Sequence, residues 1–180
     1  LADDKVGFPH QTAGLMLSPW AFAAAGDWDK AVAEHDTKGD PLAAIIDRYN
    51  RAQILELRRR YPEAEALYKG LITDGSGGAA LFYQPYGEFL ERRGRQDEAV
   101  ALYDQAIALL PRDGELVAAR ARAAQKGKPP AAPDIRHGAA QSLYYAAAAM
   151  SAQRQTELAL VYNRMALRLD PSLNARSEEH

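Results

Sequence analysis

Hydrophobic residues recur every three or four positions along most of the chain, the spacing that gathers them on one face of an α-helix. The pattern is clearest between residues 79 and 111. Its first half ends at Gly94 and its second at Pro111, two residue types that commonly end helices. The apolar positions are Leu81, Tyr83, Tyr86, Phe89 and Leu90, then Ala99, Leu102, Tyr103, Ala106, Ile107 and Leu110. The segment is predicted to form two antiparallel helices.

Three other segments have the same form. Residues 40–74 open with Asp40-Pro41, an N-cap followed by a proline in the first turn. Residues 139–171 carry two more apolar helices, and residues 1–38 form a degenerate first pair with Pro19 inside its first helix. No segment has the alternating pattern of a strand, so we expect an all-α protein.

Two stretches fall outside these pairs. Residues 112–138 are interpreted as an insert, with one extra helix over 114–125 followed by an irregular, proline-rich stretch. Residues 172–180 are interpreted as the start of a further repeat or as a tail. Because the chain begins with Leu1 rather than Met, we expect a fragment of a longer protein, with a processed chain as the alternative.

The spacing of equivalent residues indicates a repeat. Ala31, Ala64 and Ala99 are 33 and 35 residues apart, and Tyr68 and Tyr103 are 35 apart. Ala99 and Ala159 are 60 apart, which equals one regular step plus the insert. Periods of this length are typical of helical hairpins stacked as a solenoid.

The segment between Ala80 and Pro111 resembles the tetratricopeptide repeat family. The residues that carry the resemblance are Tyr83, Tyr86, Gly87, Leu90, Gly94, Ala99, Tyr103, Ala106 and Pro111. The resemblance implies hairpins stacked as a right-handed superhelix, an α-solenoid. Small residues such as Gly87 would let paired helices approach closely, and Tyr103 would fill the space between neighbouring repeats.

The resemblance also implies where a partner would bind. In tetratricopeptide proteins the first helix of each pair lines a concave surface that holds peptides or helices. The register places on that surface Met16, Trp20, Tyr49, Gln53, Glu56, Gln84, Glu88, Tyr144 and Ala148. Packing in the core is an equal alternative for Trp20 and Tyr144. A clamp for a C-terminal carboxylate, made of Lys and Asn in some relatives, is not expected from these residues.

No catalytic or metal-binding motif is evident. The four histidines show no paired ligand spacing, and the chain has no cysteine, P-loop or nucleophile elbow. The loop 74–78 could form an anion-binding nest, but a flexible connection is preferred. We therefore expect a non-enzymatic protein without a metal or other cofactor.

Charge narrows the choice of partner. The net charge of −2 and pI near 6.1 give no general attraction to nucleic acid or anionic lipid. No apolar run approaches the ~20 residues that cross a bilayer. Arginines at 48, 51, 58–60, 92, 93 and 95 could form a basic rim, although a solvated helix face is preferred.

Together these observations predict a scaffold that binds a peptide or helix of a partner protein. The alternatives are a homo-oligomerisation module that pairs through the 158–169 helix, and an accessory domain of a larger multi-repeat protein. An RNA-binding helical repeat is disfavoured by the acidic pI. The absence of cysteine fits the periplasm and the cytoplasm equally. Residues 138–145 resemble exported proteobacterial tetratricopeptide proteins, which implies the periplasm.

Overall fold

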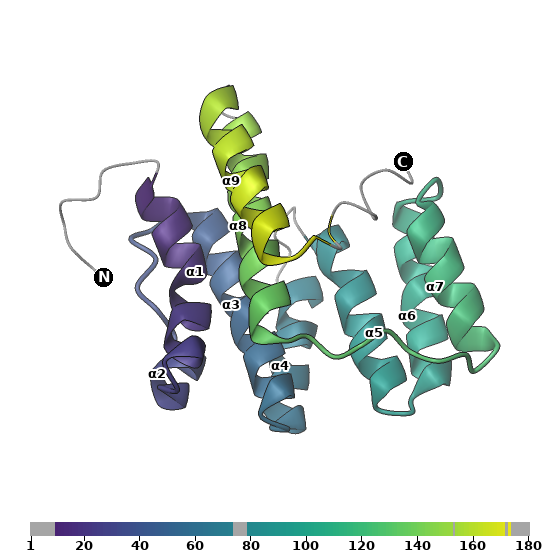
Figure 1. Ribbon diagram of the computed structural model, residues 1–180. Helices are drawn as coiled ribbons and strands as arrows, with labels where there is room; N and C mark the ends of the chain where they lie inside the picture. Colours follow the sequence, from purple (N-terminus) through teal and green to yellow (C-terminus); the bar gives the residue numbers. More distant parts are fainter. Residues whose placement is uncertain (1–9, 74–78, 153, 172, 174–180) are drawn as a thin grey trace. The chain divides into compact units, whose positions relative to one another are not determined.

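The computed structural model describes residues 10–73, 79–152, 154–171 and 173, and over these residues it contains helices and no strand. The all-α prediction is therefore confirmed. The predicted nest at 74–78 and most of the tail 172–180 lie outside the described residues. The helices are α1 (His10–Ala24), α2 (Trp28–Val32), α3 (Pro41–Leu57), α4 (Tyr61–Thr73), the 3-10 helix η1 (Ala79–Phe82), α5 (Tyr83–Arg92), α6 (Gln96–Leu109), α7 (Gly114–Ala124), α8 (Ile135–Ala152) and α9 (Thr156–Leu169) (Figure 1).

The chain divides into two compact units. The first unit combines residues 1–59 with residues 133–180, and the second unit is residues 60–132. In the first unit α8 packs against α1 and α3 as well as against its hairpin partner α9 (Figure 1). A simple solenoid stacks hairpins in sequence order. The packing of α8 on the N-terminal helices differs from that order.

Aspartate side chains cap the starts of several helices. Asp40 Oδ1 accepts hydrogen bonds from the backbone N–H groups of Leu42 and Ala43, both at 3.0 Å. Asp113 Oδ1 accepts from the Leu116 N–H at 3.1 Å, and Asp134 Oδ1 from the His137 N–H at 2.8 Å. Each carboxylate satisfies N–H groups that lack partners in the first turn of a helix. The start of α3 at Pro41 is thus the one that Asp40-Pro41 predicts.

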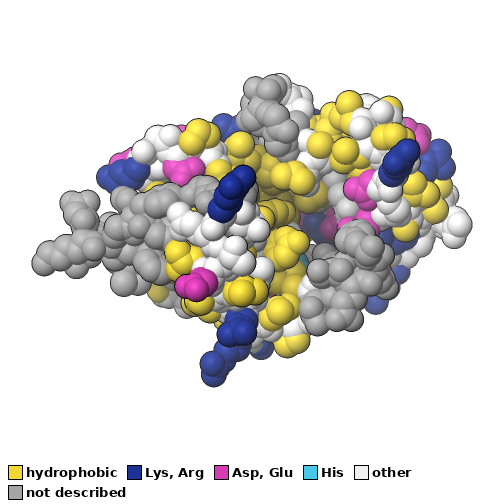
Figure 2. Space-filling model, turned by 90° about the horizontal axis from the view of Figure 1, so that it is seen from above, with side chains coloured by type: hydrophobic (Ala, Val, Ile, Leu, Met, Phe, Trp, Pro, Cys, Tyr) yellow, Lys and Arg dark blue, Asp and Glu magenta, His cyan; other side chains and the backbone are white. Residues whose placement is uncertain are grey.

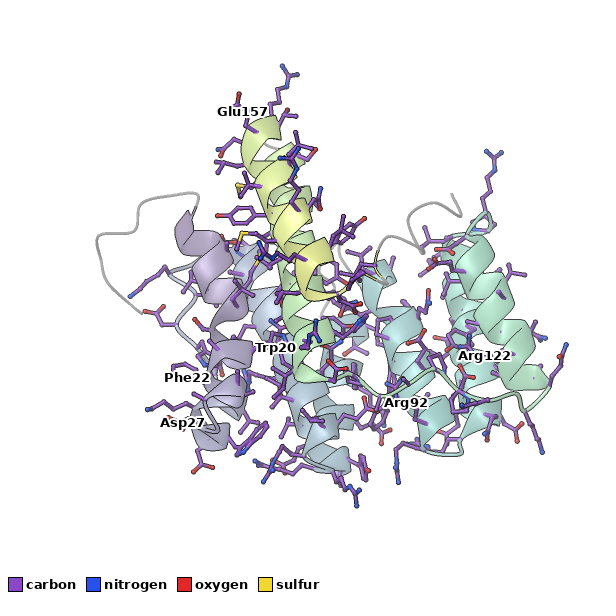
Figure 3. The ribbon with its side chains drawn as sticks, viewed as in Figure 1. Trp20, Phe22, Asp27, Arg92, Arg122 and Glu157 are labelled. Atoms are coloured by element: carbon purple, nitrogen blue, oxygen red, sulfur yellow. The ribbon has the colours of Figure 1, made fainter. Side chains whose placement is uncertain are left out.

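Trp20 lies at the centre of the apolar core of the first unit (Figure 3). It packs with Ala23, Ala31 and Ile54, and its side chain is 1% exposed. Gly138 on α8 makes this packing possible, because a Cβ atom at that position would overlap the Trp20 ring. The absence of a side chain at Gly138 therefore sets how closely α8 approaches α1.

A buried polar network joins the same helices. Asn50 Nδ2 donates to the Met16 carbonyl oxygen at 2.7 Å, which ties α3 to α1. Gln141 Oε1 on α8 accepts from the Tyr49 hydroxyl at 3.1 Å and from Gln53 Nε2 at 3.0 Å. Because buried polar groups are costly unless paired, these bonds specify how α1, α3 and α8 fit together.

The second unit contains the predicted hairpin, now seen as α5 and α6. A Cβ atom on Gly87 would overlap the Tyr103 ring, as expected from the need for a small residue there. The Tyr103 ring lies against Gly87 within its own hairpin, and its hydroxyl donates to Glu91 Oε1 at 2.7 Å.

Candidate partner-binding site

Most of the side chains predicted to bind a partner are buried. Met16, Trp20, Tyr49, Gln53 and Glu56 all lie in the first unit and are at most 5% exposed. Tyr49 and Gln53 meet at Gln141, within the polar network of α3 and α8. For Trp20 the core-packing alternative is the one observed. These five side chains hold helices together and offer no continuous surface to a partner.

The other predicted residues are more accessible but do not form one site. Gln84 and Glu88 are half-buried in the second unit, where Gln84 Nε2 donates to Glu88 Oε1 at 3.1 Å. Tyr144 lies in the first unit with 47% of its surface exposed, so it is not a core residue. Ala148, one turn further along α8, is also exposed.

A different set of residues in the first unit forms an open pocket of about 540 Å³. We call it the Trp28 pocket. Its lining residues come from α2, from the end of α3 and from the start of α8, and they are Trp28, Leu57, Arg58, Asp134, Ile135 and Arg136. Three of them are large apolar side chains. The pocket therefore offers contact area to an apolar group.

Local helix signals place these side chains. Asp27 Oδ1 accepts from the Lys30 N–H at 3.4 Å and caps α2, so that Trp28 is its first residue. Asp134 caps α8 in the same way, which places Ile135 and Arg136 in the first turn. Trp28 and Ile135 also pack against the Trp20 core, and this anchors the floor of the pocket.

Two arginines supply the positive charge of the pocket. The Arg58 guanidinium carbon lies 4.6 Å from the centre of the Trp28 ring, a cation–π contact. Arg136 Nη2 donates to the carbonyl oxygen of Leu169 at 2.9 Å. Over the described ranges, neither arginine forms an ion pair with a carboxylate. Among the described lining residues the one carboxylate is Asp134, which accepts the helix-capping bond.

Most other arginines of the predicted basic rim are engaged elsewhere. Arg51 pairs with Asp47 at 3.3 Å, and Arg60 pairs with Glu63. In the second unit Arg93 stacks on Tyr61, with its guanidinium carbon 3.7 Å from the ring centre. Arg95 contacts both Glu65 and Glu98. Most arginines of the predicted rim therefore contact a carboxylate or an aromatic ring. Arg58 also contacts a ring, but its ring partner, Trp28, lines a pocket.

Glu65 is the centre of a charged network in the second unit. Arg95 Nη1 donates to Glu65 Oε2 at 2.8 Å, and Lys69 Nζ and the Tyr86 hydroxyl lie 3.1 Å from Oε1. The hydrogen bond from Arg95 is the main reason that the pKa of Glu65 falls from 4.5 to about 2. Burial and the adjacent Glu65 carboxylate raise the pKa of Tyr86. The network joins α4, α5 and the start of α6.

Two histidines also pair with carboxylates. His35 Nδ1 lies 2.6 Å from Asp47 Oδ1, and His137 Nδ1 lies 2.6 Å from Asp170 Oδ2. Asp47 is shared with Arg51, whose Nε donates to the Val32 carbonyl oxygen at 3.0 Å. These contacts fasten the segment after α2 to α3, and the start of α8 to the end of α9. No group of three or more His, Asp or Glu side chains suited to a metal ion occurs in the described part of the chain.

In comparisons with protein-family models, curated proteins and solved structures, none matched this chain. A search of the described helices for a membrane span found none with sufficient length and hydrophobicity.

Sequence reasoning missed most of the Trp28 pocket. Trp28 was not among the residues predicted to bind a partner, and Arg58 was interpreted only as part of a basic rim. Asp27 and Asp134 were available as signals, since an aspartate before an apolar residue is a typical helix start. That Arg58 and Arg136 line one pocket depends on α8 returning to α3, which no local pattern encodes.

Proposed function

We propose that this chain is a non-catalytic protein-interaction module that binds a segment of a partner protein in the Trp28 pocket. The observation that carries the proposal is an open apolar pocket bordered by two arginines, neither of which has an acidic partner among the described residues. Among the described residues that line the pocket there is no serine, threonine, cysteine, histidine or lysine that would serve as a nucleophile or proton carrier.

The tetratricopeptide type of fold, which the sequence predicts, is also part of this proposal. We propose that the α5–α6 hairpin is of the tetratricopeptide type, supported by the motif between Tyr83 and Pro111 and by the close approach at Gly87. A right-handed solenoid and a periplasmic location, with the cytoplasm as the alternative, remain predictions from the resemblance. We propose the Trp28 pocket as the binding site in place of the predicted concave surface, because five of the residues predicted on that surface are buried.

A protein partner is a better match to the surface than nucleic acid. The net charge is −2, and lysine and arginine side chains are scattered over the face seen in Figure 2 and do not gather in one patch. Hydrophobic side chains are also exposed on that face (Figure 2). Nucleic-acid interfaces usually need a continuous basic surface.

The test compares three forms of the chain as bait for cellular proteins, with quantitative mass spectrometry as the readout. Leu57→Glu places a carboxylate in the pocket, and the control Leu109→Glu places one on α6, where Leu109 is 60% exposed. We expect a partner that the wild type and Leu109→Glu recover equally and that Leu57→Glu loses. A partner recovered equally by all three forms would place binding outside the pocket.

Self-association is the second candidate function, and a separate observation favours it. Large apolar side chains on α8 and α9 are exposed, namely Tyr144 (47%), Leu160 (52%), Val161 (48%), Met165 (47%) and Leu169 (36%). Val161, Met165 and Leu169 are four residues apart and therefore share one face of α9. Such a stripe suits a symmetric helix-to-helix contact.

Sedimentation equilibrium over a hundredfold range of concentration, roughly 1 to 100 μM, tests this candidate. If α9 mediates pairing, the wild-type mass rises with concentration and Met165→Glu abolishes the rise. Val117→Glu is the control, because Val117 is equally exposed but lies on α7. A constant monomer mass for the wild type would exclude pairing over that range.

A further inference from the structure

We infer that the Trp28 pocket selects an acidic peptide segment, in which a large apolar side chain enters the pocket and a neighbouring carboxylate binds Arg58 and Arg136. This inference rests on the proposed function and specifies the chemistry of the partner. It follows from the charges, the apolar floor and the way in which the first arginine is held.

Arg58 is held in a conformation that suits a carboxylate. Its guanidinium carbon lies 4.6 Å from the centre of the Trp28 ring, and this cation–π contact restricts the side chain. A guanidinium has five N–H donors, and over the described residues the Arg58 side chain forms no hydrogen bond that occupies them. Because the ring contact restricts the side chain before binding, less entropy is lost when a carboxylate docks.

Arg136 brings a second positive charge to the same pocket. One of its terminal nitrogens already donates to Leu169 O at 2.9 Å, which anchors the side chain across the end of α9. The opposing charge in the lining is Asp134, whose Oδ1 holds the His137 N–H at the start of α8. Two guanidinium groups against one carboxylate leave a surplus of one positive charge in the lining. The pocket is therefore complementary to one added carboxylate.

The floor of the pocket indicates a peptide and not a free anion. Trp28, Leu57 and Ile135 present apolar surface, which a phosphate or sulfate ion would leave without a partner. A volume of about 540 Å³ has room for a leucine or phenylalanine side chain with its neighbouring backbone. An apolar residue flanked by glutamate or aspartate satisfies both parts of the lining.

The probe is a phage-displayed library of random twelve-residue peptides, selected on the purified chain. Enriched peptides are then synthesised and titrated by fluorescence anisotropy against three proteins. These are the wild type, Arg58→Gln/Arg136→Gln, and the control Arg154→Gln/Arg164→Gln. The control removes the same two charges from exposed arginines of the first unit that lie outside the pocket. Thermal unfolding of each variant verifies that the fold is retained.

We expect enriched peptides to place glutamate or aspartate beside a large apolar residue. The pocket variant should bind them about tenfold or more weakly, and the control within about twofold of the wild type, as for a lost charge-assisted contact. Changing the peptide's acid to its amide should weaken binding to the wild type but have little further effect on the pocket variant. This non-additivity would assign the carboxylate to the two arginines.

Other outcomes separate the inference from the proposed function. Peptides that lack an acid, or that bind the pocket variant as well as the wild type, would overturn the acidic-peptide inference alone. A fourth titration uses Leu57→Glu, which changes the apolar part of the pocket. If acidic peptides bind and Leu57→Glu has no effect on their affinity, both the pocket and the inference are wrong. If the library yields no binding peptide, the proposed function and the inference fail together. If inorganic phosphate at equal concentration displaces the bound peptide, the pocket binds simple anions and the acidic-peptide inference is wrong.

Discussion

Arg122 compensates a carboxylate that lies inside the second unit. Glu91 on α5 is 2% exposed, and it accepts hydrogen bonds from Arg122 Nε at 3.0 Å and Nη2 at 2.7 Å. The Tyr103 hydroxyl donates to the same carboxylate at 2.7 Å. The pair with Glu91 raises the pKa of Arg122, and burial raises the pKa of Tyr103. Removing Arg122 would leave Glu91 buried without its counter-charge.

We predict that Arg122→Ala lowers the free energy of unfolding by about 2 to 3 kcal/mol. This is less than the roughly 3 to 5 kcal/mol for breaking a fully buried pair, because Arg122 itself is partly exposed. Arg120→Ala on the same helix is the control. Arg120 pairs with Asp104, and both side chains are more than 40% exposed, so the loss of this pair should cost much less than the loss of Arg122. Urea denaturation measures both values. Equal losses would show that burial of the Glu91 pair is not important.

The low pKa of Glu65 predicts a dependence of stability on pH. In the unfolded chain the carboxyl titrates near 4.5, and in the folded chain near 2. The folded state therefore gains stability from the ionised carboxylate above pH 4.5, and loses it as the pH falls from 4.5 towards 2. We predict that Glu65→Gln lowers the melting temperature near neutral pH and that the difference from wild type disappears by about pH 2.

Melting curves between pH 2 and 7 test this prediction, provided that unfolding is reversible. Asp97→Asn is the control, because Asp97 is exposed and forms no ion pair over the described ranges. It should leave the acid part of the wild-type profile unchanged. A difference between wild type and Glu65→Gln that is the same at pH 2 and pH 7 would contradict the assigned role of Arg95.

At the scale of single residues, the sequence identified packing residues better than binding residues. Gly87 was correctly expected to permit a close approach, because a small residue within an apolar helix face has few other uses. Tyr49 and Gln53 were expected on a surface, because the register of the tetratricopeptide resemblance placed them on the concave face. They are buried because Gln141, 88 residues after Gln53, supplies their hydrogen bonds. A bond of that sequence separation leaves no local pattern.

At the scale of helices, bounds follow local signals closely. Asp40-Pro41 begins α3, and Gly94 lies between α5 and α6 with a positive φ of 74°. Pro19 does not end its helix as such a signal would predict, because α1 continues through it from His10 to Ala24. A proline inside a helix removes one hydrogen bond and usually bends or ends it. In α1 the buried side chain of Trp20 adds apolar packing directly after this proline.

The contact between α1 and α8 yields a prediction about two glycines. Gly138→Ala should destabilise the first unit by about 1 to 3 kcal/mol, because the new methyl group overlaps the buried Trp20 ring. Gly14→Ala on α1 is the control. No atom lies within 4 Å of a Cβ placed there, so it should stabilise the helix by up to about 1 kcal/mol. Fluorescence-detected unfolding measures both. A neutral Gly138→Ala would mean that α8 does not lie against Trp20.

At the scale of the molecule, the repeat period predicted helix pairs but not how they are grouped. The spacing of Ala31, Ala64 and Ala99 indicates hairpins of similar length. It carries no information on which hairpin neighbours which. The close approach of α8 to α1 instead requires Gly138 opposite Trp20, and Asn50 between Met16 and Ser142. Such matched pairs are specific, but the sequence shows them only after the structure has brought them together.

The candidate site depends on the same grouping. Trp28, Arg58 and Arg136 belong to three helices, and they form a pocket because α8 returns to the N-terminal helices. Each residue alone has an ordinary explanation, as a helix start or a charge near a helix end. The pocket and its two arginines are therefore properties of the folded first unit.

The measurement that tests the binding proposal most directly is site-specific photo-crosslinking in the cells from which the chain comes. A benzoylphenylalanine replaces Leu57 in the Trp28 pocket or, as the control, Leu109 on α6. We predict one discrete adduct from position 57, absent from position 109, whose crosslinked peptide carries an acid beside a large apolar residue. Adducts of equal yield at both positions, or none at position 57, would contradict a partner bound in this pocket.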